Sequence, residues 1–69
     1  MTNTIKVERA KKNYTQADLA EKVGVSRQTI NSIEKGKFVP STLLALKIAQ
    51  VFEVAIESVF ALEEKDWSE

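Results

Sequence analysis

Apolar side chains recur three and four positions apart along this 69-residue chain, and this spacing constrains its fold more than any other feature. It places them on one face of an α-helix, whereas a half-buried strand needs alternation at every second residue, which no segment shows. The clearest example runs from residue 41 to about residue 52. Its predicted inner face consists of Leu44, Ala45, Ile48, Ala49 and Phe52. The pattern predicts an all-α fold.

Capping residues predict where the first two helices begin and end. The first helix covers about residues 4–12, and Asn13 then has a residue type that closes helices in the left-handed conformation. The second helix begins after Thr15, because Thr15 and Asp18 have the spacing of a capping box. It ends at Gly24.

Three further helices are predicted in the remainder of the chain. The third begins after Ser26, a good N-cap, and ends near Gly36. An extended connection follows, because the residue before Pro40 is excluded from the helical region. Ser41 caps the fourth helix, and a short fifth helix is predicted at about residues 56–60.

Cysteine and histidine are absent, which excludes many kinds of site. No disulfide, thiolate nucleophile or imidazole base is available, and zinc seldom accepts a site made of carboxylates alone. We therefore expect no metal, no cofactor and no enzymatic activity. No apolar run approaches the roughly 20 residues of a membrane span, and no leader peptide is recognisable. We expect a cytoplasmic protein.

The formal net charge is zero, but the charges are unevenly distributed. Residues 1–37 contain eight Lys or Arg against four Asp or Glu, a net charge of +4, whereas residues 38–69 contain two against six, a net charge of −4. Such asymmetry favours an anion-facing surface on the first half. A solvated charged face is the alternative interpretation.

The second and third predicted helices form a helix-turn-helix pattern, because only a short link containing Gly24 separates them. If Ile30 and Ile33 are buried, four polar residues face outward on the third helix. They are Arg27, Gln28, Asn31 and Ser32. Arginine binds guanine, and Gln or Asn binds adenine, through paired hydrogen bonds in the major groove. We therefore predict that these four residues read bases, the alternative being a merely solvated helix face.

The residues around this face are suited to binding phosphate. Free backbone N–H groups at the start of a helix, together with a polar side chain, can hold a phosphate group. Lysines beside them would position the protein on the duplex without reading sequence. The predicted phosphate-binding residues are Thr15, Gln16, Ser26, Lys35 and Lys37.

Four segments together resemble the repressor/Cro-type helix-turn-helix regulators, often called the XRE family. They are TQADLA at 15–20, GVSRQTI at 24–30, IEKGK at 33–37 and PS at 40–41. The resemblance covers about residues 4–62 and implies a compact five-helix, lambda-repressor-like domain that dimerises on a palindromic operator. It places Gln16 at the family's phosphate-clamping position. Arg27, Gln28 and Ser32 fall where the family reads bases, with Asn31 beside them.

The resemblance also assigns structural roles outside the predicted DNA face. It implies an ion pair between Arg9 in the first helix and Glu34 at the end of the third. Glu53 replaces the usual glycine after the fourth helix, where a left-handed turn would cost roughly 1 kcal/mol. Ala55 replaces the usual N-cap serine of the fifth helix, a change that costs about 1 kcal/mol.

We expect residues 1–69 to form one domain, with a core at 4–62 and an acidic tail at 63–69. Domains below about 70–80 residues often gain stability by oligomerising. Leu43 and Leu46 lie off the inner stripe of the fourth helix, and further apolar residues lie near the end of the chain. The predicted interface of a twofold dimer consists of Ile56, Phe60, Leu62 and Trp67. A frayed acidic tail is the alternative.

The sequence therefore predicts a DNA-binding transcriptional regulator whose partner is double-stranded DNA. We expect a homodimer that represses transcription by occupying its operator. The alternative is an antitoxin-type protein that binds a protein partner through its acidic C-terminal half and also binds DNA. Neither a membrane nor a small-molecule effector is an expected partner.

Overall fold

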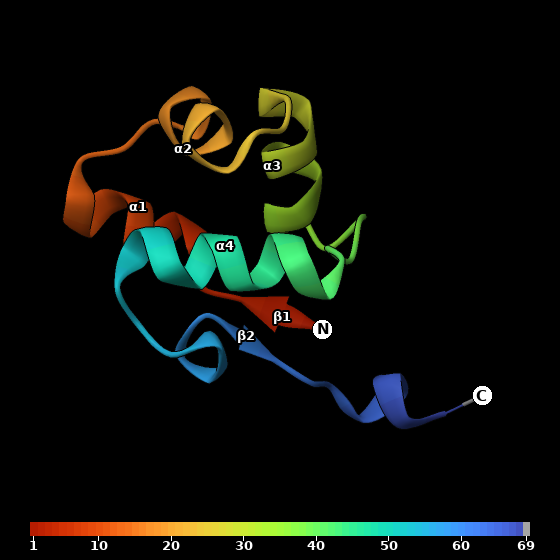
Figure 1. Cartoon of the computed structure of the whole chain (residues 1–69). Helices are drawn as coiled ribbons and strands as arrows, with labels where there is room; N and C mark the ends of the chain where they lie inside the picture. The colour runs from red at the N-terminus through yellow and green to blue at the C-terminus, as the bar shows by residue number, and fades with distance from the viewer. Residues whose placement is uncertain (69) are drawn as a thin grey trace.

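The computed structural model describes residues 1–68 and contains four α-helices (Figure 1). They are α1 (Ile5–Lys12), α2 (Gln16–Val23), α3 (Arg27–Glu34) and α4 (Thr42–Phe52). In Figure 1, α4 passes beneath α2 and α3, so that the other helices are assembled around it. The predicted bounds of the first four helices are confirmed to within one or two residues. Within the described part of the chain, no helix is long and apolar enough to span a membrane.

The predicted capping residues close these helices. Asn13 adopts the left-handed conformation after α1, with φ at 59°. Thr15 and Asp18 form both bonds of the capping box, since each side chain accepts a hydrogen bond from the other residue's backbone N–H. Ser26 and Ser41 cap α3 and α4 by accepting from backbone N–H groups three residues later. Local chemistry therefore determines where the helices begin.

The prediction of a fifth helix at about residues 56–60 is wrong. Its place is taken by a single 3₁₀ turn, η1 (Ile56–Ser58), and then by a short strand, β2 (Phe60–Ala61). Ala55 precedes η1 and makes no side-chain capping bond. The chain leaves the helical conformation at Phe60, where it pairs with residues near the start of the chain.

A two-stranded antiparallel ribbon corrects the expectation of a purely helical fold. Strand β1 (Thr2–Asn3) pairs with β2, with Thr2 opposite Ala61 and Asn3 opposite Phe60. Strands of two residues are too short to show the alternation by which a strand is recognised in a sequence. The ribbon is extended by a hydrogen bond of 2.9 Å from Thr4 N to Val59 O.

The core lies where α1, α2, α3 and α4 meet the segment that contains η1. Its most completely buried side chains are Ile5, Leu19, Ile30, Ile33, Ile48 and Val59. Small residues are buried among them, since Ala20 on α2 and Ala49 on α4 are each 3% exposed. The buried faces of α2 and α3 fix the orientation of both helices, and therefore which side of α3 faces solvent.

The ribbon also supports the end of α3. Asn3 Nδ2 donates to Ile33 O at 2.9 Å, and Asn3 Oδ1 accepts from the Ile5 backbone N–H at 3.2 Å. One side chain thus connects the start of α1 to the last turn of α3.

The acidic residues that follow the ribbon contact the start of the chain, and Glu69 lies outside the described residues. The segment forms a 3₁₀ turn, η2 (Glu64–Trp67). The Met1 amine lies 2.8 Å from carboxylate oxygens of both Glu63 and Asp66. The hydrogen bonds that the amine donates to Asp66 and Glu63 raise its pKa above the ordinary value.

The left-handed residue after α4 provides a test of local strain. Glu53 has φ at 60°, a conformation that costs an L-residue about 1 kcal/mol and that glycine adopts freely. Its contact with Lys12 is exposed and 3.4 Å long, so its loss costs little. We expect Glu53→Gly to raise the free energy of unfolding in urea by about 1 kcal/mol. Glu53→Gln, which retains the strain, should change it by less than about 0.5 kcal/mol; a destabilising Glu53→Gly would contradict this account.

Candidate nucleic-acid interface

The turn between α2 and α3 reverses the chain within three residues. Gly24 has φ at 78°, a left-handed conformation that glycine adopts without steric cost. The backbone N–H groups of Gly24 and Val25 both donate to Ala20 O, at 2.9 and 3.0 Å. Figure 1 shows α3 running from this turn down toward α4, steeply inclined to α4. The two helices therefore form a helix-turn-helix unit.

One side of α3 is buried and the opposite side is accessible. Ile30 and Ile33 are at most 1% exposed and face the core. The four predicted base-reading residues remain accessible: Arg27 and Gln28 are exposed, and Asn31 and Ser32 are half-buried. The structure therefore brings these four residues together on the solvent side of one helix.

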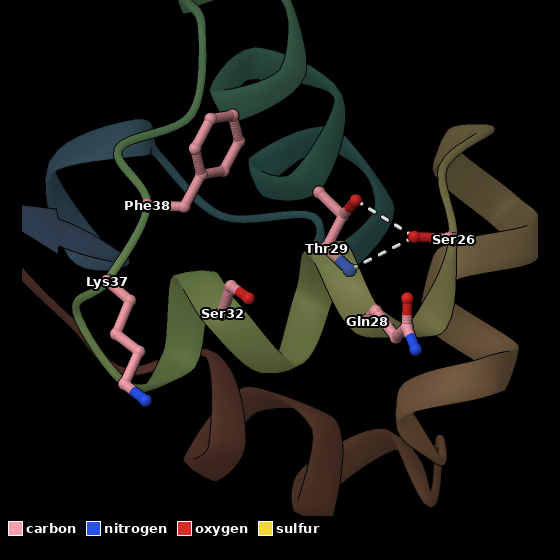
Figure 2. Close-up of a pocket in the computed structure, with 6 residues that line it drawn as sticks. All are labelled: Ser26, Gln28, Thr29, Ser32, Lys37 and Phe38. Atoms are coloured by element: carbon pink, nitrogen blue, oxygen red, sulfur yellow. Dashed lines mark hydrogen bonds between the residues drawn. The ribbon is translucent and has the colours of Figure 1, made fainter.

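Gln28 and Ser32 lie on one edge of this surface, beside the connection that follows α3. Figure 2 shows both side chains facing an open groove that is bordered by Lys37 and Phe38. At the start of α3, Ser26 Oγ accepts from the Thr29 backbone N–H at 3.1 Å and lies 3.0 Å from Thr29 Oγ1 (Figure 2). The Lys37 ammonium group and the Phe38 ring thus lie next to two of the base-reading candidates.

Arg27 and Asn31 lie on the other edge of α3, which contacts the start of α2 through Gln16. Gln16 Oε1 accepts from Arg27 Nη1 at 3.3 Å, and Gln16 Nε2 donates to Asn31 Oδ1 at 3.2 Å. Gln16 Nε2 also donates to Glu34 Oε1, again at 3.2 Å. One amide therefore bonds to the first turn, the middle and the last turn of α3.

Arg9 and Glu34 form an ion pair behind this edge. Arg9 Nε lies 2.7 Å from Glu34 Oε2, and Arg9 Nη2 lies 3.2 Å from Glu34 Oε1. The third nitrogen of the guanidinium, Nη1, donates to Tyr14 O at 3.0 Å. The two charged side chains are only 14% and 9% exposed. Their geometry is that of a structural pair that joins α1 to α3.

The five predicted phosphate-binding residues do not form one cluster. Ser26 and Thr15 use their oxygens as helix caps, and Lys37 is exposed beside the groove of Figure 2. Both Nε2 hydrogens of Gln16 are directed to protein acceptors, so a clamp at this position depends on the backbone N–H groups of the first turn of α2. Lys35 is not brought to the groove; it lines a separate cleft with Met1 and Glu63.

The start of α2 also contains a carboxylate, which reduces its attraction for anions. Hydrogen bonding to the Thr15 backbone, and then to the Thr15 side chain, holds the pKa of Asp18 below its ordinary value. Asp18 is therefore charged at neutral pH. Its Oδ2 accepts the capping-box hydrogen bond from the Thr15 backbone N–H. Lys37, the cation that lines the groove, is therefore better placed to attract phosphate than the start of α2.

The predicted dimer residues separate into two groups. Phe60 is 8% exposed and belongs to the core, so little of it is accessible to a partner. Ile56 is half-buried against the core, and its place in an interface stays a prediction. They are covered because the chain after α4 folds back as a ribbon against β1. Leu62 and Trp67 extend beyond the ribbon and are 61% and 77% exposed.

Two residues that the sequence did not single out contribute to the site. Tyr14 provides the carbonyl that anchors Arg9, and Lys22 Nζ lies 4.8 Å from the centre of the Tyr14 ring. Phe38 is 47% exposed beside Gln28 and Ser32. The signal for Phe38 was its position next to Lys37 in a predicted extended connection.

Comparison with known proteins places this geometry in a family. A family model described as helix-turn-helix matches residues 5–59. An uncharacterized HTH-type transcriptional regulator of Methanocaldococcus jannaschii is 56% identical over 66 residues, which cover 96% of this chain and 100% of that protein.

Two solved structures resemble the chain closely. The N-terminal DNA-binding domain of SinR from Bacillus subtilis has a TM-score of 0.74 at 31% identity, covering 87% of this chain and 88% of that one. The SOS-response transcriptional repressor LexA of Eubacterium rectale has a TM-score of 0.76 at 27% identity, covering 87% and 64%.

The ion pair between Arg9 and Glu34 provides a test of how the site is supported. Removing one partner of a buried pair leaves the other charge uncompensated, so Arg9→Met should lower the free energy of unfolding by about 3 kcal/mol. Lys11→Met removes a cation from the same helix whose contact with Glu8 is exposed, and it should cost less than about 0.5 kcal/mol. Equal losses in urea unfolding would show that the pair is not structural.

Proposed function

Because the chain belongs to the XRE-type helix-turn-helix family of transcriptional regulators, we propose that it is a repressor that binds a palindromic operator as a homodimer. The observation that carries the proposal is the surface of α3, where four hydrogen-bonding side chains lie together opposite Ile30 and Ile33. A helix presented in this way fits the major groove of B-DNA.

Base recognition is assigned to Arg27, Gln28, Asn31 and Ser32. Arginine can bind both O6 and N7 of guanine, and an amide can bind both N6 and N7 of adenine. Three of these residues lie in the N-terminal part or middle of α3, the portion that helix-turn-helix proteins place against base edges.

Phosphate contacts are assigned to groups on either side of that helix. One contact is assigned to the backbone N–H groups at the start of α2 that the capping box leaves free. The other is assigned to the exposed Lys37, which lies beside the opposite edge of α3. Such contacts fix the position of the protein on the duplex but carry no sequence information. Lys35 is assigned a weaker role, because it lines a different cleft.

The proposed dimer interface is revised to the apolar residues that remain exposed. Leu62 and Trp67 are joined by Leu43 and Leu46, which are 65% and 50% exposed on α4. A twofold interface would place two copies of α3 about 34–36 Å apart, one turn of DNA, which is why a palindromic operator is proposed.

Repression is proposed by simple occupancy of the operator. The similar LexA protein is named as a transcriptional repressor, and a domain of this size needs no further activity to exclude another protein from the same DNA. Binding of a protein partner by the acidic C-terminal half is the alternative, because Leu62 and Trp67 would be available to it as well.

The proposed division between base and phosphate contacts can be tested with two alanine variants. Gln28→Ala should weaken binding to the preferred operator by about 1–3 kcal/mol and relax selectivity at one base pair. Lys37→Ala should weaken binding to all sequences alike and reduce the slope of log K against log salt by about one. Identical behaviour of the two variants across sequences, measured by fluorescence anisotropy, would contradict the assignment.

The proposed dimer can be tested by sedimentation equilibrium at tens of micromolar protein. The unaltered chain should sediment as a dimer, and Trp67→Glu should convert it to a monomer, because a charge would be buried without a partner. Val7→Glu is the matched control, since Val7 is 55% exposed on α1 outside the proposed interface. A monomeric wild type would favour the alternative of a separate protein partner.

A further inference from the structure

The orientation of the Gln16 amide follows from the groups that surround it. Arginine can only donate hydrogen bonds, so both carboxylate oxygens of Glu34 accept from Arg9. An ionised carboxylate can only accept, so Gln16 has to present Nε2 to Glu34. The oxygen of the same amide then faces the opposite way, where Arg27 Nη1 donates to it. The ion pair therefore determines which end of the Gln16 amide faces which partner.

The same reasoning extends to Asn31. The second Nε2 hydrogen of Gln16 needs an acceptor, and Asn31 Oδ1 provides it at 3.2 Å. With its oxygen held by Gln16, Asn31 is left with Nδ2, whose two hydrogens make no hydrogen bond elsewhere in residues 1–68. Arg27 also presents donors, because a guanidinium has no acceptor. The edge of α3 next to α2 therefore presents hydrogen-bond donors, from Asn31 Nδ2 and the Arg27 guanidinium.

We propose that the Arg9–Glu34 pair, acting through Gln16, orients Asn31 so that it selects guanine instead of the adenine that a free asparagine amide would bind. This inference rests on the proposed function. Guanine offers two acceptors in the major groove, O6 and N7, whereas adenine offers one acceptor and one donor. An amide that reads adenine has to direct both its oxygen and its nitrogen at the base, and in Asn31 the oxygen is directed at Gln16 instead.

Gln28 provides a contrast on the same helix. Its side chain is exposed and makes no hydrogen bond within the described part of the chain, so its amide can turn to present a donor and an acceptor together. The two edges of α3 should therefore differ: guanine is preferred beside α2, and adenine is accepted beside Lys37. Arg9 and Glu34 are positioning residues in this scheme, and Asn31 determines specificity.

The specificity assignment can be tested by selecting from random duplex DNA with the wild-type chain and with Asn31→Asp. The wild type should prefer guanine over adenine by about tenfold or more at the base pair that responds to position 31. Asn31→Asp replaces the outward donor by an acceptor, so that preference should change to cytosine, which offers its N4 hydrogens. An adenine preference in the wild type, or no position that responds to Asn31→Asp, would overturn the proposal.

The positioning role can be tested with Gln16→Met, which keeps the side-chain length and removes its hydrogen bonds. Asn31 is then free to turn, and the guanine preference over adenine at that base pair should fall to within about threefold. Gln28→Met is the matched control, and it should alter a different base pair. An unchanged preference in Gln16→Met would show that Gln16 does not orient Asn31.

Measurements without DNA separate failure of this inference from failure of the proposed function. In the NMR spectrum of the free protein, the Gln16 side-chain amide hydrogens should exchange with water more slowly than those of Gln28, and Arg9→Met should remove the difference. Equal exchange in the wild type would overturn the orienting network even if the protein binds DNA. If the wild type selects no sequence at all, the proposed function fails, and this inference fails with it.

Discussion

The Glu34 carboxylate is the point on which the rest of the site depends. It lies at the end of α3, accepts two hydrogen bonds from Arg9 of α1 and one from Gln16 of α2, and is 9% exposed. A buried carboxylate is tolerated when it is paired and hydrogen-bonded. This one is satisfied by groups from two other helices, so it fixes α3 relative to both of them.

A chain of this size has few other means of holding a recognition helix in place. Its core is small, and within residues 1–68 the connection after α4 supplies a 3₁₀ turn and a two-residue strand where a fifth helix was expected. The first residues compensate for this, because Asn3 joins the ribbon to the last turn of α3 through Ile33 O. The last turn of α3 is thus held by the ribbon through Ile33 O and by the ion pair through Glu34.

The parts of the fold that follow local rules could be predicted from the sequence. The helix starts at Thr15, Ser26 and Ser41, and the left-handed residues at Asn13 and Gly24, depend on a few neighbouring residues. Ribbon pairing depends on residues almost sixty positions apart, and its strands are too short to leave a pattern.

The candidate site shows the same division between local and long-range information. The positions of Arg27, Gln28, Asn31 and Ser32 follow from which side of α3 is apolar. The direction of the Gln16 amide cannot be deduced from that pattern, because it depends on the Arg9–Glu34 pair and on the crossing of α2 and α3. The burial of Phe60 could not be predicted for a related reason, since it requires the ribbon that the sequence did not reveal.

The central claim is that the exposed side of α3 is the surface that meets DNA. It is tested most directly by titrating the ¹⁵N-labelled protein with a duplex obtained by selection and following its backbone amide resonances. The largest shifts are expected in α3, at the start of α2 and at Lys37, with small shifts along α4. Shifts concentrated on Leu43, Leu46 and residues 62–67, with α3 unaffected, would contradict it.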